Sequence, residues 1–281
     1  MVANTYCSCG YVIPESSGVF DLRTAEDRQR FERFTQEYRR VRASEGWGDD
    51  DPRYYTNLPH STSRHNYVWS VRRRTFQALE RLIQERFHDR RAALDVGAGN
   101  CWLTRNLSDW QFQAVALDIS DDPRDGLAAR KAYRQHFWCV LSPMERLPFP
   151  DQQFQFVVAS GSFHYASAPD EVLAEFTRVL EPNGLIVIMD TPTYFRIVDG
   201  EQMVEDRTRT LTTCHGMTRE IASWSKFITF KDLGDLFMNR GLEYEVIQPW
   251  PGIRRSASSL WNRIRGTRIA RFPLFVAWQR T

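Results

Sequence analysis

The sequence predicts an α/β fold built on a doubly wound, mostly parallel sheet. Between residues 92 and 189, short apolar runs alternate with stretches of helical periodicity, the pattern of parallel strands joined by crossover helices. The first apolar run also ends in two glycines one residue apart, Gly97 and Gly99, before a helix begins at Trp102. A strand, a glycine turn and a helix N-terminus together are typical of a site for a nucleotide-like ligand.

The individual elements follow from the same patterns. We expect strands over 92–96, 112–117, 137–141, 154–159 and 185–189, and helices over 102–107, 126–135 and 170–180. Glu181-Pro182-Asn183-Gly184 would end the last of these helices and turn the chain into the next strand. After residue 190 we expect a helix over 231–240 and two alternating strands over 243–248 and 275–279.

The residues before the sheet predict a helical extension. Phe31, Phe34, Tyr38 and Val41 recur at helical spacing within 24–44, and a second helix is expected over 68–87. The stretch between these helices is polar, aromatic and loop-like, which is typical of a lid. We therefore divide the chain into a turn-rich start (1–22), a helical extension or lid (23–90) and a sheet domain (91–281). The sheet domain would carry insertions at 191–228 and 251–271.

Composition limits the class of protein. The 281 residues are 42% hydrophobic, enough for a substantial core, and the net charge of +2 gives no general attraction to nucleic acid or anionic membrane. The five cysteines have no framework spacing, which favours a reducing compartment. We find neither a signal peptide nor an apolar run long enough to span a membrane. We expect a cytoplasmic protein.

Two acidic residues indicate which nucleotide-like ligand the turn holds. Asp118 ends the second strand 19 residues after Gly99, where an acid accepts hydrogen bonds from ribose hydroxyls. Asp95 lies two residues before Gly97, where it would repel a pyrophosphate but favour a cationic amino acid or a sulfonium. The third glycine of the dinucleotide motif is absent. These features favour S-adenosylmethionine over NAD.

The motif Asp95-Val96-Gly97-Ala98-Gly99-Asn100 resembles the first motif of class I S-adenosylmethionine-dependent methyltransferases. The segments 144–151, 154–160 and 175–184 resemble later motifs of the ubiquinone/menaquinone-biosynthesis-like branch, called methyltransferase type 11. The resemblance covers residues 92–190. It implies a Rossmann-like, seven-stranded sheet in which the strands near 243–279 form an antiparallel hairpin.

The resemblance also implies a set of cofactor-binding residues. These are Asp95, Gly97, Gly99, Asn100, Asp118, Ile119, Met144, Glu145 and Ser160. The glycines and Ser160 would lie along the methionine part, with Asp95 near its amino group. Asp118 would hold the ribose, and Ile119, Met144 and Glu145 would lie against the adenine.

Two residues depart from the family pattern. Cys101 stands where the family usually has glycine, which predicts less room beside the ligand. Gln155 stands where the fourth strand often carries aspartate. No acid-dependent role is therefore expected at that strand.

The methyl acceptor would be a small molecule, methylated by direct SN2 displacement. His164 follows the fourth strand and is the candidate for a base or an acceptor-orienting group, the alternative being a structural histidine. We expect an aromatic acceptor pocket from the two segments that cover the sheet. Its candidate residues are Tyr54, Tyr55, Trp69, Tyr165, Tyr194 and Met203.

Other readings stay open at this point. The pair Cys7 and Cys9 resembles half of a zinc-ribbon-like module, but a zinc site needs four ligands and we expect no metal. The arginine-rich stretch 251–271 could be a solvated insertion, a peripheral membrane contact or an anionic-substrate patch. We expect no nucleic-acid partner. Two alternative functions nevertheless stay open: an RNA methyltransferase and a non-catalytic protein of the same fold.

Overall fold

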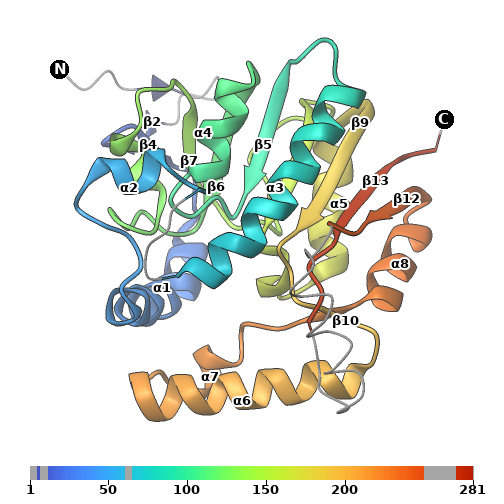
Figure 1. Ribbon diagram of the computed structural model, residues 1–281. Helices are drawn as coiled ribbons and strands as arrows, with labels where there is room; N and C mark the ends of the chain where they lie inside the picture. Colours follow the sequence, from blue (N-terminus) through green and yellow to red (C-terminus); the bar gives the residue numbers. More distant parts are fainter. Residues whose placement is uncertain (1–4, 7–11, 61–64, 250–269, 281) are drawn as a thin grey trace.

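We analysed a computed structural model, which describes residues 5–6, 12–60, 65–249 and 270–280. At its centre is a sheet in the order β12-β13-β9-β8-β5-β6-β7-β4-β3 (Figure 1). Its strands are β3 (Glu15–Ser16), β4 (Val19–Asp21), β5 (Ala92–Val96), β6 (Gln113–Asp118), β7 (Trp138–Leu141), β8 (Phe154–Ser160), β9 (Leu180–Met189), β12 (Leu242–Ile247) and β13 (Leu274–Gln279). Two short pairs lie apart from it: β1 (Thr5–Tyr6) with β2 (Val12–Ile13), and β10 (Thr193–Tyr194) with β11 (Ile228–Thr229).

The topology confirms the predicted fold class. Strands β5 to β9 are parallel, and their order reverses at β5, which has β6 on one side and β8 on the other. Strand β13 runs antiparallel to both β9 and β12. Ligands of such sheets bind beyond the carboxyl ends of the strands at the reversal point. The end of β5 is therefore the expected site.

The sheet is wider than the seven strands we expected. Strand β4 pairs in parallel with β7, with Val19 opposite Cys139, and β3 pairs with β4. Nine strands are thus paired in the described part of the chain. Residues 15–21, which we placed in the turn-rich start, belong to this sheet because Val19 packs into its core.

Helices cover both faces of the sheet (Figure 1). They are α1 (Ala25–Glu45), α2 (Pro52–Thr56), α3 (Asn66–Arg86), α4 (Trp102–Asp109), η1 (Leu127–Ala132), η2 (Phe163–Tyr165), α5 (Pro169–Val179), α6 (Ile197–His215), α7 (Arg219–Ala222) and α8 (Phe230–Asn239), where η marks a 3-10 helix. Ala93 packs into the core under α3 and α4, and Leu94 into the core under α5 and α8. Strand β5 is buried on both faces, which explains its nearly continuous apolar sequence.

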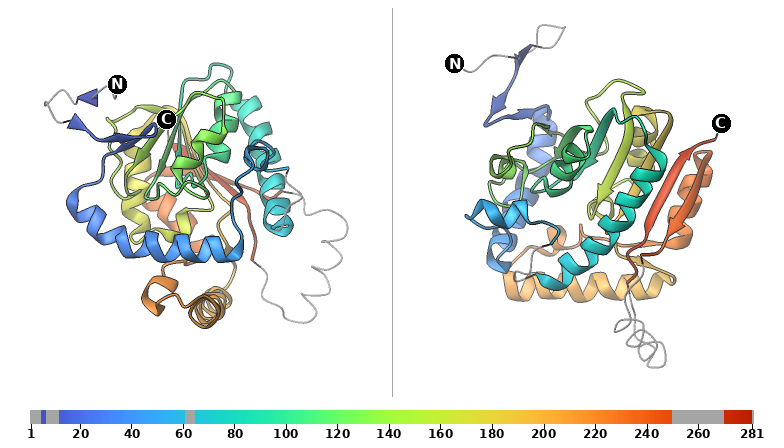
Figure 2. Two further views of the ribbon diagram at one scale, coloured as in Figure 1. Left: turned by 90° about the vertical axis from the view of Figure 1, so that its left-hand side faces the viewer. Right: turned by 45° about the horizontal axis from the view of Figure 1, so that its top comes forward.

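A cap formed by α1, α6 and α7 lies at the carboxyl ends of the parallel strands (Figures 1 and 2). Helix α1 begins with a capping box between Thr24 and Asp27 and ends at Gly46, whose φ is 79°. Phe34 and Val41 of α1 pack with Leu211 of α6 in a separate apolar cluster. The insertion 191–228, to which the sequence analysis assigned no helices or strands, therefore completes the cap.

Some sequence expectations differ from the structure or fall outside it. The helix expected over 126–135 is only the turn η1, because Tyr133 leaves the helical path and donates its hydroxyl to the Asn100 carbonyl. Cys7, Cys9 and all but the end of the basic stretch 251–271 lie outside the described residues. Within the described ranges, none of the helices combines the length and apolar character that crossing a membrane requires.

Candidate cofactor and acceptor site

A cavity of about 240 Å³ lies between the carboxyl ends of the strands and the cap. The glycine turn after β5 and the loops after β6, β7 and β8 form one side, and α1 with the residues after α7 forms the other. The cavity brings together eight of the nine residues that the resemblance marked for cofactor binding: Gly97, Gly99, Asn100, Asp118, Ile119, Met144, Glu145 and Ser160.

The glycine turn is held tightly against its neighbours. The N–H groups of Gly97 and Ala98 both donate to the Leu117 carbonyl, at 2.7 and 3.0 Å. Gly97 has φ 72°, and a Cβ on it would lie 2.2 Å from the Cβ of Ser162. Both the backbone conformation and the close approach of the loop after β8 therefore require glycine at this position.

Asp118 links the end of β6 to the same turn. Its Oδ2 accepts from the Gly99 N–H and its Oδ1 from the Ser120 N–H, both at 2.9 Å. Burial raises the pKa of this carboxyl, although these N–H groups oppose the rise. Each carboxylate oxygen retains a further lone pair. The side chain is thus fixed in place and can still accept hydrogen bonds from hydroxyls in the cavity.

Asp95 lies behind the turn rather than on the cavity wall. It is 1% exposed, and Thr104 Oγ1 donates to its Oδ2 at 2.7 Å. Its Oδ1 has no hydrogen-bond partner among the described residues. Burial raises the pKa of Asp95 to about 7; the Thr104 hydrogen bond opposes this, and the negative charge of Asp118 adds to it. A positive charge bound at the turn would stabilise the ionised form.

Arg72 of α3 reaches the cavity beside the end of β8. Its guanidinium carbon lies 4.9 Å from the centre of the Trp69 ring, and its Nη2 lies 3.0 Å from the position of a Cβ on Gly161. Its charge acts on Asp190, whose carboxylate accepts from Ser160 Oγ at 2.8 Å. We did not predict Arg72. It is followed by two more arginines, and helical periodicity alone does not show which of the three faces a ligand.

The cap contributes a set of stacked aromatic rings. Phe34 of α1 stacks on Trp224 with ring centres 4.7 Å apart and on Tyr38 at 5.3 Å. Tyr165, which follows β8, meets Phe34 and Tyr38 edge-on at 6.1 Å. Phe31, Phe34 and Tyr38 showed helical spacing in the sequence, but this spacing is equally typical of any helix packed on a core.

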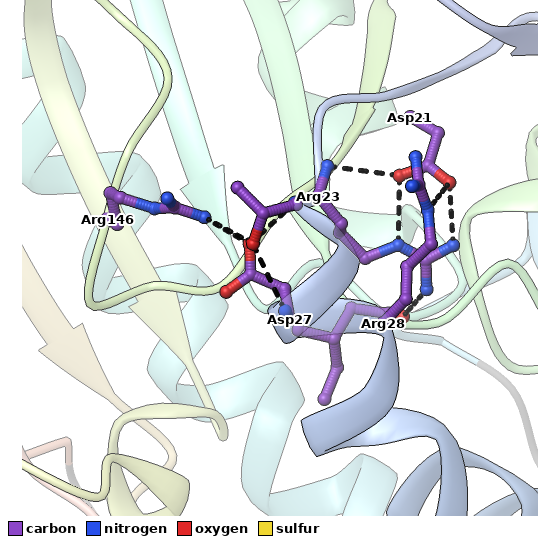
Figure 3. Close-up of polar contacts among 7 residues, drawn as sticks. Asp21, Arg23, Asp27, Arg28 and Arg146 are labelled. Carbon is purple, nitrogen blue, oxygen red and sulfur yellow. Dashed lines mark hydrogen bonds and ion pairs between the residues drawn. The ribbon is translucent and has the colours of Figure 1, made fainter.

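Ion pairs fasten α1 to two loops that line the cavity. Arg146, after β7, pairs with Asp27 near the start of α1 (Figure 3), and Arg42 near its end pairs with Asp125, after β6. Ahead of the helix, Arg23 donates to both oxygens of Asp21 at 2.9 Å and to the Ile119 carbonyl at 3.1 Å. These contacts place the aromatic face of α1 over the cavity.

The structure does not bring most of our acceptor candidates into the cavity. Of the six, only Tyr165 lines it; Tyr54, Tyr55, Trp69, Tyr194 and Met203 do not. Tyr55, Trp69 and Tyr194 are buried in the core. The Tyr55 hydroxyl lies 2.9 Å from the carbonyl oxygens of both Asp49 and Arg124 and can donate to either, which holds the loop that follows α1 beside η1. Helix α1, rather than this loop, covers the opening.

His164 is close to the cavity but does not line it. Its Nδ1 has no hydrogen-bond partner among the described residues, and its carbonyl accepts from the Lys226 N–H at 3.0 Å. Burial, together with the positive charges of Arg207 and Arg72, lowers the pKa of its imidazole to about 3. A neutral imidazole with so low a pKa is a weak base near neutral pH.

The thiol of Cys101 points away from the cavity. The residue has φ 62°, in the left-handed region, and its Sγ lies 3.7 and 3.9 Å from the carbonyl oxygens of Gly99 and Leu127. The expectation that Cys101 narrows the ligand site is therefore corrected. The family usually has glycine at this position because the backbone is left-handed there, a conformation that costs a non-glycine residue about 1 kcal/mol.

The sequence of the core region matches a known family. Residues 94–188 match the family model described as "Methyltransferase domain", and they include most of β5, all of β6, β7 and β8, most of β9 and the glycine turn. These residues are therefore similar in sequence to methyltransferase domains, and the sheet has the class I methyltransferase fold. Domains of this class use S-adenosylmethionine, and the donor set at the cavity fits it: a fixed acid for ribose, an unpaired buried carboxyl and a cation beside the turn.

Individual relatives agree with this assignment of the domain. A malonyl-[acyl-carrier protein] O-methyltransferase of Halorhodospira halophila is 32% identical over 39% of this chain and 37% of its own length. A demethylmenaquinone methyltransferase of Renibacterium salmoninarum is 31% identical over 40% of this chain and 47% of its own. The chain thus matches less than half the length of either relative. A putative S-adenosylmethionine-dependent methyltransferase from Listeria monocytogenes shares the fold, with TM-score 0.55 and 15% identity over 75% of this chain and all of that one.

Proposed function

We propose that the protein is an S-adenosylmethionine-dependent methyltransferase that acts on a small or carrier-bound molecule. The observation that carries the proposal is the convergence of the Gly97 turn, Asp118 and Arg72 on one cavity beneath an aromatic cap. The two relatives described above are named for methylation of carrier-bound malonate and of demethylmenaquinone. Their names support this class of acceptor.

Each part of the cofactor has a complementary group in the cavity. Asp118 would accept hydrogen bonds from the ribose hydroxyls, and the backbone beside Gly97 would approach the methionine part closely. The methionine end carries both charges: its carboxylate would face Arg72, and its ammonium would lie in the negative field of Asp95.

The remaining residues of the set lie around the same ligand. Ile119 and Met144 would pack on the adenine, and Glu145 lies at its edge, where Ser167 fixes the carboxylate through hydrogen bonds of 2.6 and 3.1 Å. Asn100 and Ser160 also line the cavity, and they would lie near the methionine part.

When bound, S-adenosylmethionine supplies a methyl group that leaves its sulfur with the C–S bond electrons remaining on sulfur. The protein's part is to hold the acceptor in line with that bond and to exclude water. Correct placement can lower a barrier by roughly 7–11 kcal/mol in favourable cases. The stack of Phe34, Tyr38 and Trp224 supplies a rigid apolar surface for this purpose.

Calorimetry tests the proposal directly. We expect S-adenosylhomocysteine to bind the purified protein with one-to-one stoichiometry and a dissociation constant of about 1–100 μM, in the usual range of enzyme ligands. NAD at the same concentration is expected to give no heat. Binding of NAD in place of S-adenosylhomocysteine, or of neither, would contradict the assignment.

The raised pKa of Asp95 predicts a pH-dependent affinity. In the free protein this carboxyl is about half protonated at pH 7, and a bound ammonium would lower its pKa. Binding below pH 7 therefore releases a proton, and affinity for S-adenosylhomocysteine should rise by up to about tenfold per pH unit between pH 5.5 and 7 before levelling off. Asp95→Asn keeps the side-chain shape but does not titrate. An equally steep profile in that variant would show that another group is responsible.

A further inference from the structure

Charges are segregated within the cavity. Its acidic lining residues, Asp118, Asp125 and Glu145, all come from the end of β6 and the loops after β6 and β7. The cap side consists of the lining residues of α1 together with Trp224 and Lys226, and it contributes Arg30, Arg42 and Lys226 but no acid among the described residues. The acids therefore lie on the side of the proposed cofactor, together with Arg72 of α3, whereas the three cations of the cap lie on the opposite side.

Two of these cations already have polar partners. Arg42 pairs with Asp125, and Arg30 donates to Ser167 Oγ at 2.8 Å. The Lys226 ammonium forms no ion pair within the described ranges, although its backbone N–H is fixed by the His164 carbonyl. Lys226 thus presents an unpaired positive charge two residues after the stacked ring of Trp224.

A second cation adds to this charge from α6. Arg207 is exposed on α6 and does not line the cavity, but its charge acts on both His164 and Tyr38. No ion pair of Arg207 occurs in the part of the chain that the structure describes. Aromatic rings alone would also suit a cationic acceptor, but Lys226 and Arg207 would repel one.

We infer that the methyl acceptor is an anion with a flat apolar body. Its carboxylate-type group lies against Lys226, within the positive field of Arg207, and its body packs on Trp224 and Tyr165. The inference rests on the proposed function, since it places the acceptor in the part of the cavity that bound S-adenosylmethionine would not fill. It also suits the chemistry. A carboxylate oxygen can attack the methyl carbon with its own lone pair, so that the O–C bond forms while the C–S bond breaks and its electrons stay on sulfur. No proton is released, and no general base is needed. This agrees with the weak basicity of His164 and with a cavity lining that includes no histidine among the described residues.

The test uses a pair of probes that differ only in charge. Binding of 1-naphthoate and of the neutral 1-naphthamide is measured by calorimetry on the full-length protein saturated with S-adenosylhomocysteine. We expect the carboxylate to bind at least about tenfold more tightly. We expect Lys226→Met to reduce that preference about fivefold, and Arg207→Met, outside the cavity lining, to reduce it about twofold. Affinity for S-adenosylhomocysteine should be unchanged in both variants.

Matched controls distinguish specific contacts from overall charge. Arg209→Met removes an exposed arginine of the same helix that pairs with Asp206, and Lys231→Met removes an exposed lysine of α8 that pairs with Asp235. Neither should change the preference. Equal binding of the two probes, no binding of the carboxylate, or equal effects of the control substitutions would overturn the inference. S-adenosylhomocysteine is titrated first, and its failure to bind would contradict the proposed function. In that case the two probes are titrated on the protein without S-adenosylhomocysteine, which tests the inference about charge separately.

Discussion

Gly97→Ala is expected to abolish measurable cofactor binding and to lower the free energy of unfolding by about 3 kcal/mol. The new Cβ would lie 2.2 Å from Ser162 Cβ and 2.7 Å from its Oγ, at a residue whose φ is 72°. Ser162 cannot easily yield, because its hydroxyl donates to the Val96 carbonyl at 2.5 Å inside the core. The turn would therefore have to move away from Leu117, and the backbone that approaches the cofactor would move with it.

Gly216→Ala is the matched control, because Gly216 has a similar φ of 61° with no atom within 4 Å of the new Cβ. It should cost only the backbone strain, about 1 kcal/mol, and leave cofactor binding intact. Adding Ser162→Gly to Gly97→Ala should restore part of the stability by removing the clashing atoms. Chemical denaturation and titration with S-adenosylhomocysteine measure both effects. Similar losses in the two glycine variants would show that the contact with Ser162 is unimportant.

Asp118→Ala is expected to weaken binding of S-adenosylhomocysteine by about 100-fold, as the loss of two hydrogen bonds to a charged acceptor predicts. The carboxylate is already fixed by the N–H groups of Gly99 and Ser120, so little ordering is required when the ribose hydroxyls bind. Asp118→Asn should have a smaller effect, because its amide oxygen still accepts. Calorimetry at pH 7.5 gives the dissociation constants.

The control for this series is Asp121→Ala, three residues further along the same loop. Asp121 is 57% exposed and pairs with Arg39 on the surface, where such pairs contribute little. We expect less than about a twofold change in affinity. If Asp118→Ala bound as well as the parent protein, the ribose would have to be held elsewhere, and the orientation proposed for the cofactor would be wrong.

Several features of this protein follow from local order along the chain and could be predicted without its structure. The alternation of strands and helices, the turn at Gly97 and the acid at Asp118 could be predicted because the carboxyl ends of adjacent parallel strands meet at one edge. Eight of the nine cofactor candidates line one cavity for this reason. Each of these residues lies at or shortly after the carboxyl end of a strand, so a correct prediction of the strand also places the residue at the site.

Other residues of the site come from distant segments of the chain, and only the folded structure shows which of them reach the carboxyl ends of the strands. Arg72 is the first of three consecutive arginines, and only the packing of α3 on the sheet brings it beside Gly161 in the cavity. Phe34 and Trp224 are 190 residues apart, and their stacking depends on how α1 and the cap insertion pack together. Tyr55 and Trp69 suited an acceptor pocket by composition but are buried in the core. Side chains that converge from distant elements have no shared periodicity or spacing in the sequence, because their contact is set by packing across the fold.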